Sequence, residues 1–322
     1  MKPLRSAFFL FVVASLVPAL ACAGDKAPIR IADRVYAVPG DAGTVSVENR
    51  GRVANTGFIV GPSGVIVIDT GVSYRHGKQI LSAIRSVTTL PVKLVIITHA
   101  VREFVFGAAA FEETGATLSA HRATVELMQA RCGHCLQRLE EQLGDEMQGS
   151  RLVLPTDIVE ASTAISAGGV RLQLLYFGWA ATPGDIAIYH PASATLFAGG
   201  LVSAGHVPEI RDCDFEGWQR ALRQLEALPV KHVVPGFGPP SGPDSIRATA
   251  HYLEALDARS RDLYEQSGSL LEALDHADLP EFAHWKAYEP NHRRNMLHRR
   301  LQLETQDLGG DPRSTALPDN AP

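Results

Sequence analysis

The side chains best suited to chemistry stand at the ends of two apolar runs. His99 follows residues 94–97 (Leu-Val-Ile-Ile) almost directly, Glu103 comes four residues later, and Asp69 closes an earlier apolar run. An imidazole at the end of a buried strand can be a metal ligand, a general base or simply a hydrogen-bonded strand-end residue. Glu103 can ligate a metal, or it can be a loop carboxylate paired with Arg102. These residues are the candidate catalytic and metal-binding groups.

A second candidate is the pair of cysteines in Cys132-Gly133-His134-Cys135. This spacing is found in thiol oxidoreductases, where the first cysteine is activated at a helix N-terminus that follows a strand. Here the pair lies between two helix-like runs, inside or at a break in a helical hairpin. The sequence therefore favours a disulfide between Cys132 and Cys135, or a metal clip, over a redox role, and it leaves Cys213 as the remaining thiol.

Other catalytic patterns are missing from the sequence. Ser203 and Ser241 are not set in a Gly-x-Ser-x-Gly elbow, so serine hydrolase chemistry lacks support. The sequence contains no Walker-type Gly-Lys-Ser/Thr motif and no Gly-x-Gly-x-x-Gly after a strand. Nucleotide cofactors are not implied.

The N-terminus has the pattern of a secretory signal peptide. Lys2 and Arg5 precede an apolar run over residues 7–20, and small residues follow up to Ala23. This order of charge, short apolar core and small-residue cleavage site predicts a signal over residues 1–23, which is too short for a comfortable transmembrane helix. We expect a periplasmic or secreted protein with no membrane span after cleavage. Lipid attachment at Cys22 is an alternative, although Ala19 stands where a lipid-attachment box usually has Leu.

Composition excludes several broad classes of protein. The chain has 322 residues, of which 45% are hydrophobic and 20% charged, so it is neither disordered, collagen-like nor a coiled coil. Its 30 Lys and Arg residues against 35 Asp and Glu residues give a net charge of −5. No block of like charge points to nucleic acid or to a polybasic membrane surface.

The elements that must position these residues alternate between strands and helices. Apolar alternation and runs predict strands at residues 57–60, 65–69, 94–97, 170–176, 186–189, 195–197 and 232–234. Helical spacing predicts helices at 78–87, 120–147, 215–228, 243–267 and 291–305. The first two strands form a hairpin, and the next helix and strand complete a βαβ unit, which indicates an α/β fold. We expect one domain over 29–305 and a disordered tail over 306–322, which is rich in Gly, Pro and Asp.

Six short segments carry a resemblance to a known family. In chain order they are Asn55-Thr56-Gly57-Phe58, Val67-Ile68-Asp69-Thr70-Gly71, Ile96-Ile97-Thr98-His99, Ala181-Thr182-Pro183-Gly184-Asp185, Leu196-Phe197-Ala198-Gly199 and Val234-Pro235-Gly236-Phe237-Gly238-Pro239. Together they resemble the metallo-β-lactamase-fold superfamily over residues 29–305, and most closely its exported quinoprotein-relay zinc metallohydrolases. The resemblance implies an αββα sandwich with the active site along one edge of the two packed sheets.

The same resemblance shows which metal ligands differ. The family's principal motif, His-x-His-x-Asp-His with Gly three residues on, aligns with His99 to Gly107 and keeps both of those residues. Glu103 stands for the Asp of the motif. The other ligand positions hold Val101, Phe104, Ala181, Gly200 and Phe237. The resemblance also implies that Asp69 and Asp185 support the ligand loops from behind.

Zinc hydrolases need about three protein ligands for each catalytic ion and an open position for water. One imidazole and one carboxylate do not make such a site. Apolar replacements avoid the cost of roughly 1–3 kcal/mol for each unsatisfied buried polar group. We therefore expect a site without metal, partly filled by side chains.

Three functions remain open at this stage. The leading expectation is a non-catalytic or impaired hydrolase homologue, without a cofactor, that binds a small molecule or a periplasmic protein as an accessory to a quinoprotein oxidation system. The alternative is a zinc-dependent hydrolase of esters, thioesters or lactams with a rebuilt site on His99, Glu103 and a recruited histidine such as His206. A thiol–disulfide protein acting through Cys132 and Cys135 is a third.

Overall fold

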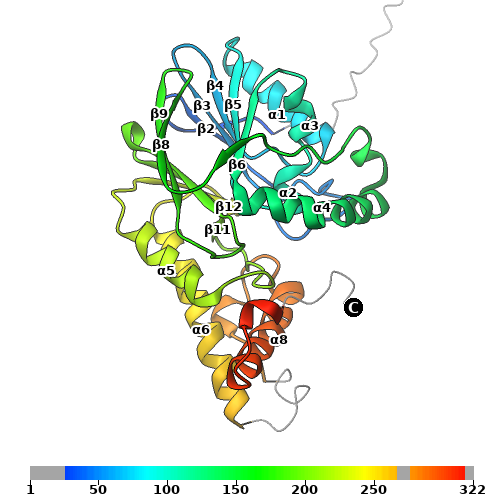
Figure 1. The fold of residues 1–322 in the computed structure, drawn as a ribbon, viewed down its shortest axis with the longest axis vertical. Coiled ribbons are helices and arrows are strands. Elements are labelled where there is room, and N and C mark those ends of the chain that lie inside the picture. Colours follow the sequence, from blue (N-terminus) through cyan, green and yellow to red (C-terminus); the bar gives the residue numbers. More distant parts are fainter. Residues whose placement is uncertain (1–25, 267–275, 316–322) are drawn as a thin grey trace, which may run out of the picture.

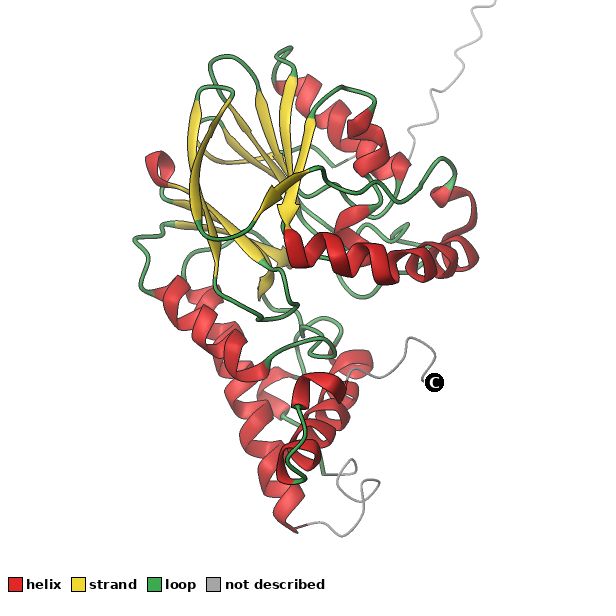
Figure 2. Ribbon diagram, viewed as in Figure 1, coloured by secondary structure: helices red, strands yellow, loops and turns green. Residues whose placement is uncertain are grey.

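The structure is a computed structural model, and it describes residues 26–266 and 276–315. The expected signal peptide and residues 316–322 of the expected tail lie outside the described residues. Two β-sheets pack face to face, and helices cover the outer face of each (Figures 1 and 2). This is the αββα sandwich that the resemblance implies, so the fold prediction is confirmed.

The first sheet has seven strands in chain order, and they are β1 (Ile29–Ala32), β2 (Val35–Val38), β3 (Thr56–Val60), β4 (Val65–Ile68), β5 (Val92–Ile97), β6 (Thr117–His121) and β7 (Asp157–Val159). Strands β1 to β4 pair antiparallel, and β4 to β7 pair parallel. The β3–β4 hairpin and the β4–α1–β5 crossover agree with the sequence prediction. Strands β1, β2, β6 and β7 had not been predicted, because they are short and carry no long apolar run.

The second sheet has five strands in the order β12, β11, β10, β9, β8. Their bounds are β8 (Thr163–Ala167), β9 (Val170–Tyr176), β10 (Ile186–His190), β11 (Thr195–Ser203) and β12 (His232–Phe237). Strands β8 to β11 pair antiparallel, and β12 adds parallel to β11. Strand β11 is buried along its whole length and runs six residues beyond the predicted stretch, to Ser203.

The first sheet is covered by α1 (Tyr74–Val87), α2 (Arg102–Val105), α3 (Ala108–Glu112) and α4 (Arg122–Leu143), which ends in the turn η1 (Gly144–Met147). The second is covered by α5 (Phe215–Glu226), α6 (Asp244–Gln266) and α8 (Tyr288–Asp307). Figure 1 shows α6 and α8 as a helical lobe below the sheets. Short 3₁₀ turns complete the elements at η2 (Pro191–Ser193), η3 (Pro280–Phe282) and η4 (Pro312–Thr315).

Three hydrophobic layers account for the four-layer stack. The middle layer joins the sheets and draws on both, for example Ile66 and Ile96 from one and Leu172 and Ile188 from the other. One outer layer packs α1, α3 and α4 on the first sheet, and the other packs α5, α6 and α8 on the second. Each sheet is therefore apolar on both faces, which is why its central strands are nearly continuous apolar runs.

Two predictions need correction. Residues 306–315 are not disordered, because α8 continues to Asp307 and η4 packs Arg313 over the ring of Trp179 at 5.4 Å. The cysteine pair is not at a break in a hairpin, because α4 is one unbroken helix through Gly133. In the described part of the chain, no helix is both long enough and apolar enough to cross a membrane.

Candidate functional site

The functional cleft lies at the edge where the carboxyl ends of β4, β5, β11 and β12 meet. Such an edge collects the residues that follow each strand, which is where α/β sheets place their ligands. It contains a cavity of about 330 Å³. One face of α4 forms a wall through Leu127, Arg131, Cys135, Arg138 and Gln142. The start of α8 forms the opposite side through Pro290, Asn291 and Arg294.

Asp69 supports this edge through hydrogen bonds with the residue that follows β5. Its carboxylate accepts hydrogen bonds from the backbone N–H of Thr98 at 2.8 Å and from the Thr98 hydroxyl. Burial raises the pKa of Asp69 to about 7, although the bonds from Thr98 oppose the rise. Its backbone has φ of 61°, a conformation that costs a non-glycine residue energy and persists only where surroundings enforce it. Asp69 does not line the cavity, so it acts as a positioning residue for the end of β5.

His99 faces the cavity and is bound from behind by Asp185. Its Nδ1 contacts an oxygen of the buried Asp185 carboxylate, which also accepts hydrogen bonds from Thr182. Burial lowers the pKa of His99, but the carboxylates of Asp185, Asp69 and Glu103 outweigh burial and raise it above its ordinary value. Asp185 thus fixes the tautomer and orientation of the imidazole, as a carboxylate does behind a histidine base.

The His99 ring occupies the space next to Gly200 on β11. A Cβ atom at position 200 would lie 2.5 Å from Nε2 of His99 and 2.6 Å from Nδ1. No side chain at Gly200 is compatible with this position of the imidazole. The space where the resemblance expects a bridging carboxylate is therefore filled by His99 itself.

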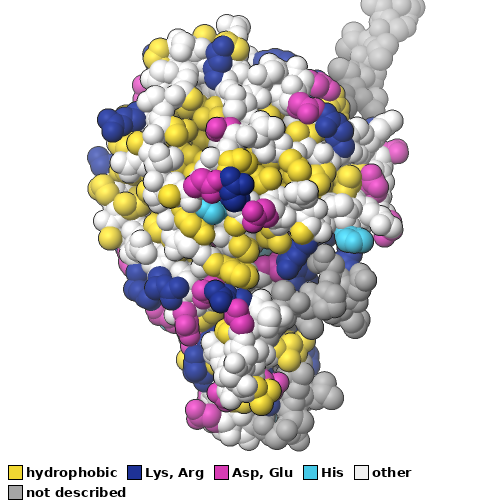
Figure 3. Space-filling model, in the orientation of Figure 1, with side chains coloured by type: hydrophobic (Ala, Val, Ile, Leu, Met, Phe, Trp, Pro, Cys, Tyr) yellow, Lys and Arg dark blue, Asp and Glu magenta, His cyan; other side chains and the backbone are white. Residues whose placement is uncertain are grey.

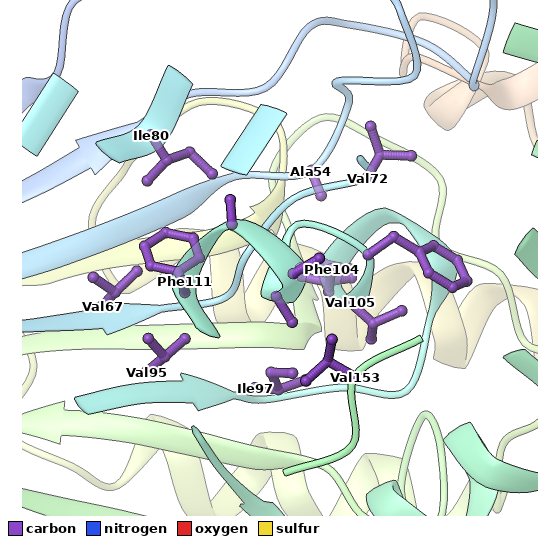
Figure 4. Packing of buried hydrophobic residues seen from close by; sticks show 14 of the residues in the cluster. Ala54, Val67, Val72, Ile80, Val95, Ile97, Phe104, Val105, Phe111 and Val153 are labelled. Atoms are coloured by element: carbon purple, nitrogen blue, oxygen red, sulfur yellow. The ribbon is translucent and has the colours of Figure 1, made fainter. Parts of the chain in front are cut away.

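Aromatic rings continue from His99 across the cleft. Phe104 meets His99 and Phe237 edge to face, with ring centroids 5.6 Å and 5.5 Å apart. Phe237 stacks on His206 at 5.0 Å. Phe104 is fully buried among the residues of the outer core (Figure 4). It does not line the cavity, whereas Phe237 does. The cleft is thus narrowed by aromatic side chains and remains open.

The residues at the family's ligand positions do not fit a zinc ion. His99 offers Nε2 as its one remaining ring nitrogen, because Nδ1 is bound to Asp185. Apart from Glu103, the other positions hold the apolar or absent side chains of Val101, Phe104, Ala181, Gly200 and Phe237. Zinc takes sulfur, imidazole nitrogen or carboxylate oxygen ligands, usually in tetrahedral groups. Within residues 26–266 and 276–315, no three His, Cys, Asp or Glu side chains are grouped so as to hold a metal ion.

Three buried polar atoms of the cleft have no hydrogen-bond partner among the described residues. They are Oε2 of Glu103, Oγ of Ser203 and Nδ1 of His206, and all three residues line the cavity. Each residue is more than nine-tenths buried. The other oxygen of Glu103 accepts from Nε of Arg102 at 3.0 Å, and Nε2 of His206 donates to the carbonyl of Gly43 at 3.2 Å. Buried polar groups are nearly always paired, so such a concentration in one cavity calls for an explanation.

The cleft is also more cationic than the chain as a whole. Five arginines and three acidic residues line it, whereas the full sequence has a net charge of −5. The arginines come from α2, α4, α8 and the loop before α5, and they are Arg102, Arg131, Arg138, Arg211 and Arg294. Elsewhere charges of both signs are interspersed, as the face in Figure 3 shows.

The structure separates the remaining candidates. His206 reaches the cleft as expected. Two other histidines do not line the cavity, because His121 caps α4 and stacks on Tyr176, and His190 bonds to Ser193. Cys132 and Cys135 are thiols, so the expected disulfide is not found. Within the continuous helix Cys132 packs into the outer core while Cys135 lines the cleft.

Arg294 is a residue of the cleft that the sequence interpretation missed. It lies in α8, far along the chain from every motif, and no pattern near it points to the cleft. The amphipathic face of α4 could have been found from its spacing, because its cleft residues repeat at helical intervals.

Comparisons with known proteins agree with the geometry. A model of the "Metallo-beta-lactamase superfamily" matches residues 49–236, more than half of the chain. A "Linear primary-alkylsulfatase" of Pseudomonas sp. (strain ATCC 19151) is 23% identical over 224 residues, or 59% of this chain and 42% of that protein. A "Metallo-beta-lactamase type 2" of Bacillus sp. (strain 170) is 24% identical over 198 residues, or 60% of this chain and 68% of that one. This chain thus spans less than half the length of the alkylsulfatase.

Two solved structures share the fold. The metallo-β-lactamase from Pontibacter korlensis superposes with a TM-score of 0.58 at 22% identity, covering 70% of this chain and 98% of that one. The metallo-β-lactamase from Hirschia baltica superposes with a TM-score of 0.57 at 20% identity, covering 70% of this chain and 96% of that one. With the sandwich, the cleft at its edge and the matched segment together, the chain belongs to the metallo-β-lactamase superfamily.

Proposed function

We propose that this protein uses the superfamily's active-site cleft to bind a small molecule and does not carry out zinc-dependent hydrolysis. The observation that carries this proposal is the seating of His99 against Gly200, beside ligand positions that hold no donor side chain. That arrangement places an imidazole where a bridging carboxylate would stand and leaves too few donors for a catalytic ion. The open cavity supports binding as the remaining use of the cleft.

Elemental analysis of the full chain, purified from the compartment where it folds, tests the proposal. We expect far less than one zinc ion per chain and no hydrolysis of ester, thioester or lactam substrates with added zinc. One tightly held zinc ion per chain, lost in a His99→Ala variant together with hydrolysis, would overturn it.

A rebuilt metal-dependent hydrolase is the second candidate. It is favoured by the unpartnered atoms of Glu103 and His206, which share the cavity with His99. In this case zinc would raise the melting temperature of the wild-type chain, and Glu103→Gln would abolish the rise. Arg85→Gln is the control, because this exposed residue lies in the last turn of α1, away from the cleft.

Export and an accessory role in a quinoprotein oxidation system complete the proposal. They are supported by the order of residues 1–23 and by the resemblance of the six motifs, respectively. Mass spectrometry of the mature N-terminus tests export: a free N-terminus after Ala23 is expected, and a lipid on Cys22 would show the alternative. Deleting the gene should impair oxidation of the quinoprotein substrate, and unchanged oxidation would reject this role.

A further inference from the structure

The cleft offers two kinds of polar group, which differ in how far they are buried. Buried residues supply hydrogen-bond acceptors that have no partner, and arginines supply cationic donors. A ligand that satisfies both must carry complementary groups at two ends. The chemistry of each end follows from the residues.

The buried end favours a hydrogen-bond donor. An ionised carboxylate accepts hydrogen bonds and cannot donate them, so Oε2 of Glu103 is an acceptor in that form. The Nε2–H of His206 donates to the carbonyl of Gly43, so Nδ1 is the unpartnered ring nitrogen and can accept a hydrogen bond. The hydroxyl of Ser203 can either donate or accept. Two acceptors and one adaptable hydroxyl fit a hydroxyl or ammonium group of a ligand.

The arginine end favours an acid. Arg131 and Arg102 are already paired with Asp212 and Glu103, respectively. Arg294 is exposed, and its hydrogen bonds go to the carbonyl of Pro290 at 2.7 Å and to Oδ1 of Asn291 at 3.1 Å, both on its own helix.

Among the residues described, no carboxylate lies within ion-pair distance of Arg294. Its guanidinium keeps its full charge toward the cleft, and a guanidinium matches a carboxylate in a bidentate way.

We propose, on the basis of the binding role above, that the cleft takes a small organic acid bearing a hydroxyl or ammonium group at its other end. Arg294 on α8 holds the acid, and Glu103, Ser203 and His206 receive the donor group. The apolar side chains of Val101 and Phe237 also line the cavity and suit an aliphatic body.

Calorimetric titration of the mature chain tests this assignment with a matched series. The probes are ω-hydroxy and ω-amino acids of four to eight carbons, the corresponding plain fatty acids, the ω-amino alcohols that lack the acid, and zinc alone. One chain length among the bifunctional acids should bind at least about tenfold more tightly than either single-function analogue, because each lost charge-assisted bond costs roughly this factor or more.

Variants then separate the two ends. Arg294→Gln should weaken binding of the acids about tenfold or more and leave the amino alcohols unchanged, while Arg85→Gln changes neither. Glu103→Gln should weaken the ω-amino acids and spare the plain fatty acids. Equal binding of plain and bifunctional acids, indifference to Arg294→Gln, or no binding across the whole series would overturn the assignment.

The titration with zinc alone distinguishes failure of this ligand assignment from failure of the proposed binding function. Stoichiometric zinc binding that Glu103→Gln abolishes would refute the binding role itself and explain the unpartnered atoms by a metal. Absence of zinc binding together with no preference among the organic probes would refute only the ligand class.

Discussion

The imidazole of His99 lies directly against the Cα atom of Gly200, so the two residues exclude any side chain at position 200. They come from different sheets, His99 from the end of β5 and Gly200 from the middle of β11. The contact thus joins the two sheets at the edge that carries the cleft. Its energetic weight can be measured.

Gly200→Ala should destabilise the chain by about 1–3 kcal/mol, because the new methyl group forces the buried imidazole to move. The cost should fall in a His99→Ala background, where the obstructing ring is absent. Urea unfolding of the two single variants and the double variant gives the coupling energy. Gly133→Ala is the control, because no atom lies within 4 Å of its added Cβ in α4, and it should stabilise by up to ~1 kcal/mol. Strict additivity of Gly200→Ala and His99→Ala would show that the contact is unimportant.

Asn55 should be among the most sensitive polar residues near the cleft. Its Oδ1 accepts from the backbone N–H of Gly40, and its Nδ2 donates to the carbonyls of Pro235 and Gly238. Asn55→Ala leaves these groups unpaired in a buried setting, so we expect a loss of about 2–3 kcal/mol or more in the free energy of unfolding.

Asn49 provides the matched control for Asn55. It also makes three side-chain hydrogen bonds to backbone, but in a partly exposed turn where water can replace them. Asn49→Ala should cost clearly less than Asn55→Ala. Equal losses in denaturant unfolding would contradict the role assigned to burial.

Acid should destabilise the chain through His76 in α1. Burial, with Arg52 and Lys26 nearby, lowers the pKa of His76 to about 3. In the unfolded chain an ordinary histidine titrates near 6.5, so from about pH 6.5 down to 3 the unfolded state binds a proton that the native state does not. Stability attributable to His76 is present above this window and is lost as pH falls through it, by about 2 kcal/mol between pH 7 and pH 5.

His76→Asn isolates that contribution. The variant should be less stable at pH 7, because the buried ring and its bond with the N–H of Val72 are lost, and its stability should fall less between pH 7 and pH 5. If the free energy of unfolding of the two proteins falls equally between pH 7 and pH 5, His76 is not neutral in the folded state.

Removing metal should leave the stability unchanged. A metal held by the folded state alone stabilises it by mass action, and a chelator would reverse that gain. Thermal unfolding of the purified chain with and without excess EDTA should give the same melting temperature. A fall on adding EDTA, restored by zinc, would point to the rebuilt metal site.

Regular apolar patterns made much of the fold predictable. Strand β9 and helices α5, α6 and α8 were predicted within a few residues, because each has a long run with a clear period. Strand β6 was missed because Thr117–His121 mixes polar and apolar residues and gains its place only by pairing with β5. The cysteine pair was expected inside or at a break in a helical hairpin, but α4 runs through Gly133 as one helix, with Cys132 and Leu139 packed in the outer core.

The site was predictable only in part. The motif positions identified His99, Glu103, Gly200 and Phe237, and the structure brings all four to one cavity. The contact of His99 with Gly200 could not be predicted, because it depends on how two sheets pack. The same holds for the stacking of His206 on Phe237, which joins a loop to the end of β12.

Helix α8 lies beyond residue 236, where the superfamily match ends, and yet it encloses the cleft. The stretch of gene that builds the sandwich is therefore separate from the stretch that shapes one side of the entrance. Substitutions on the face of α8 that lines the cleft would alter what is admitted and leave the strands of both sheets unchanged. In this chain, selectivity can evolve at the surface of one helix rather than by rebuilding the interior.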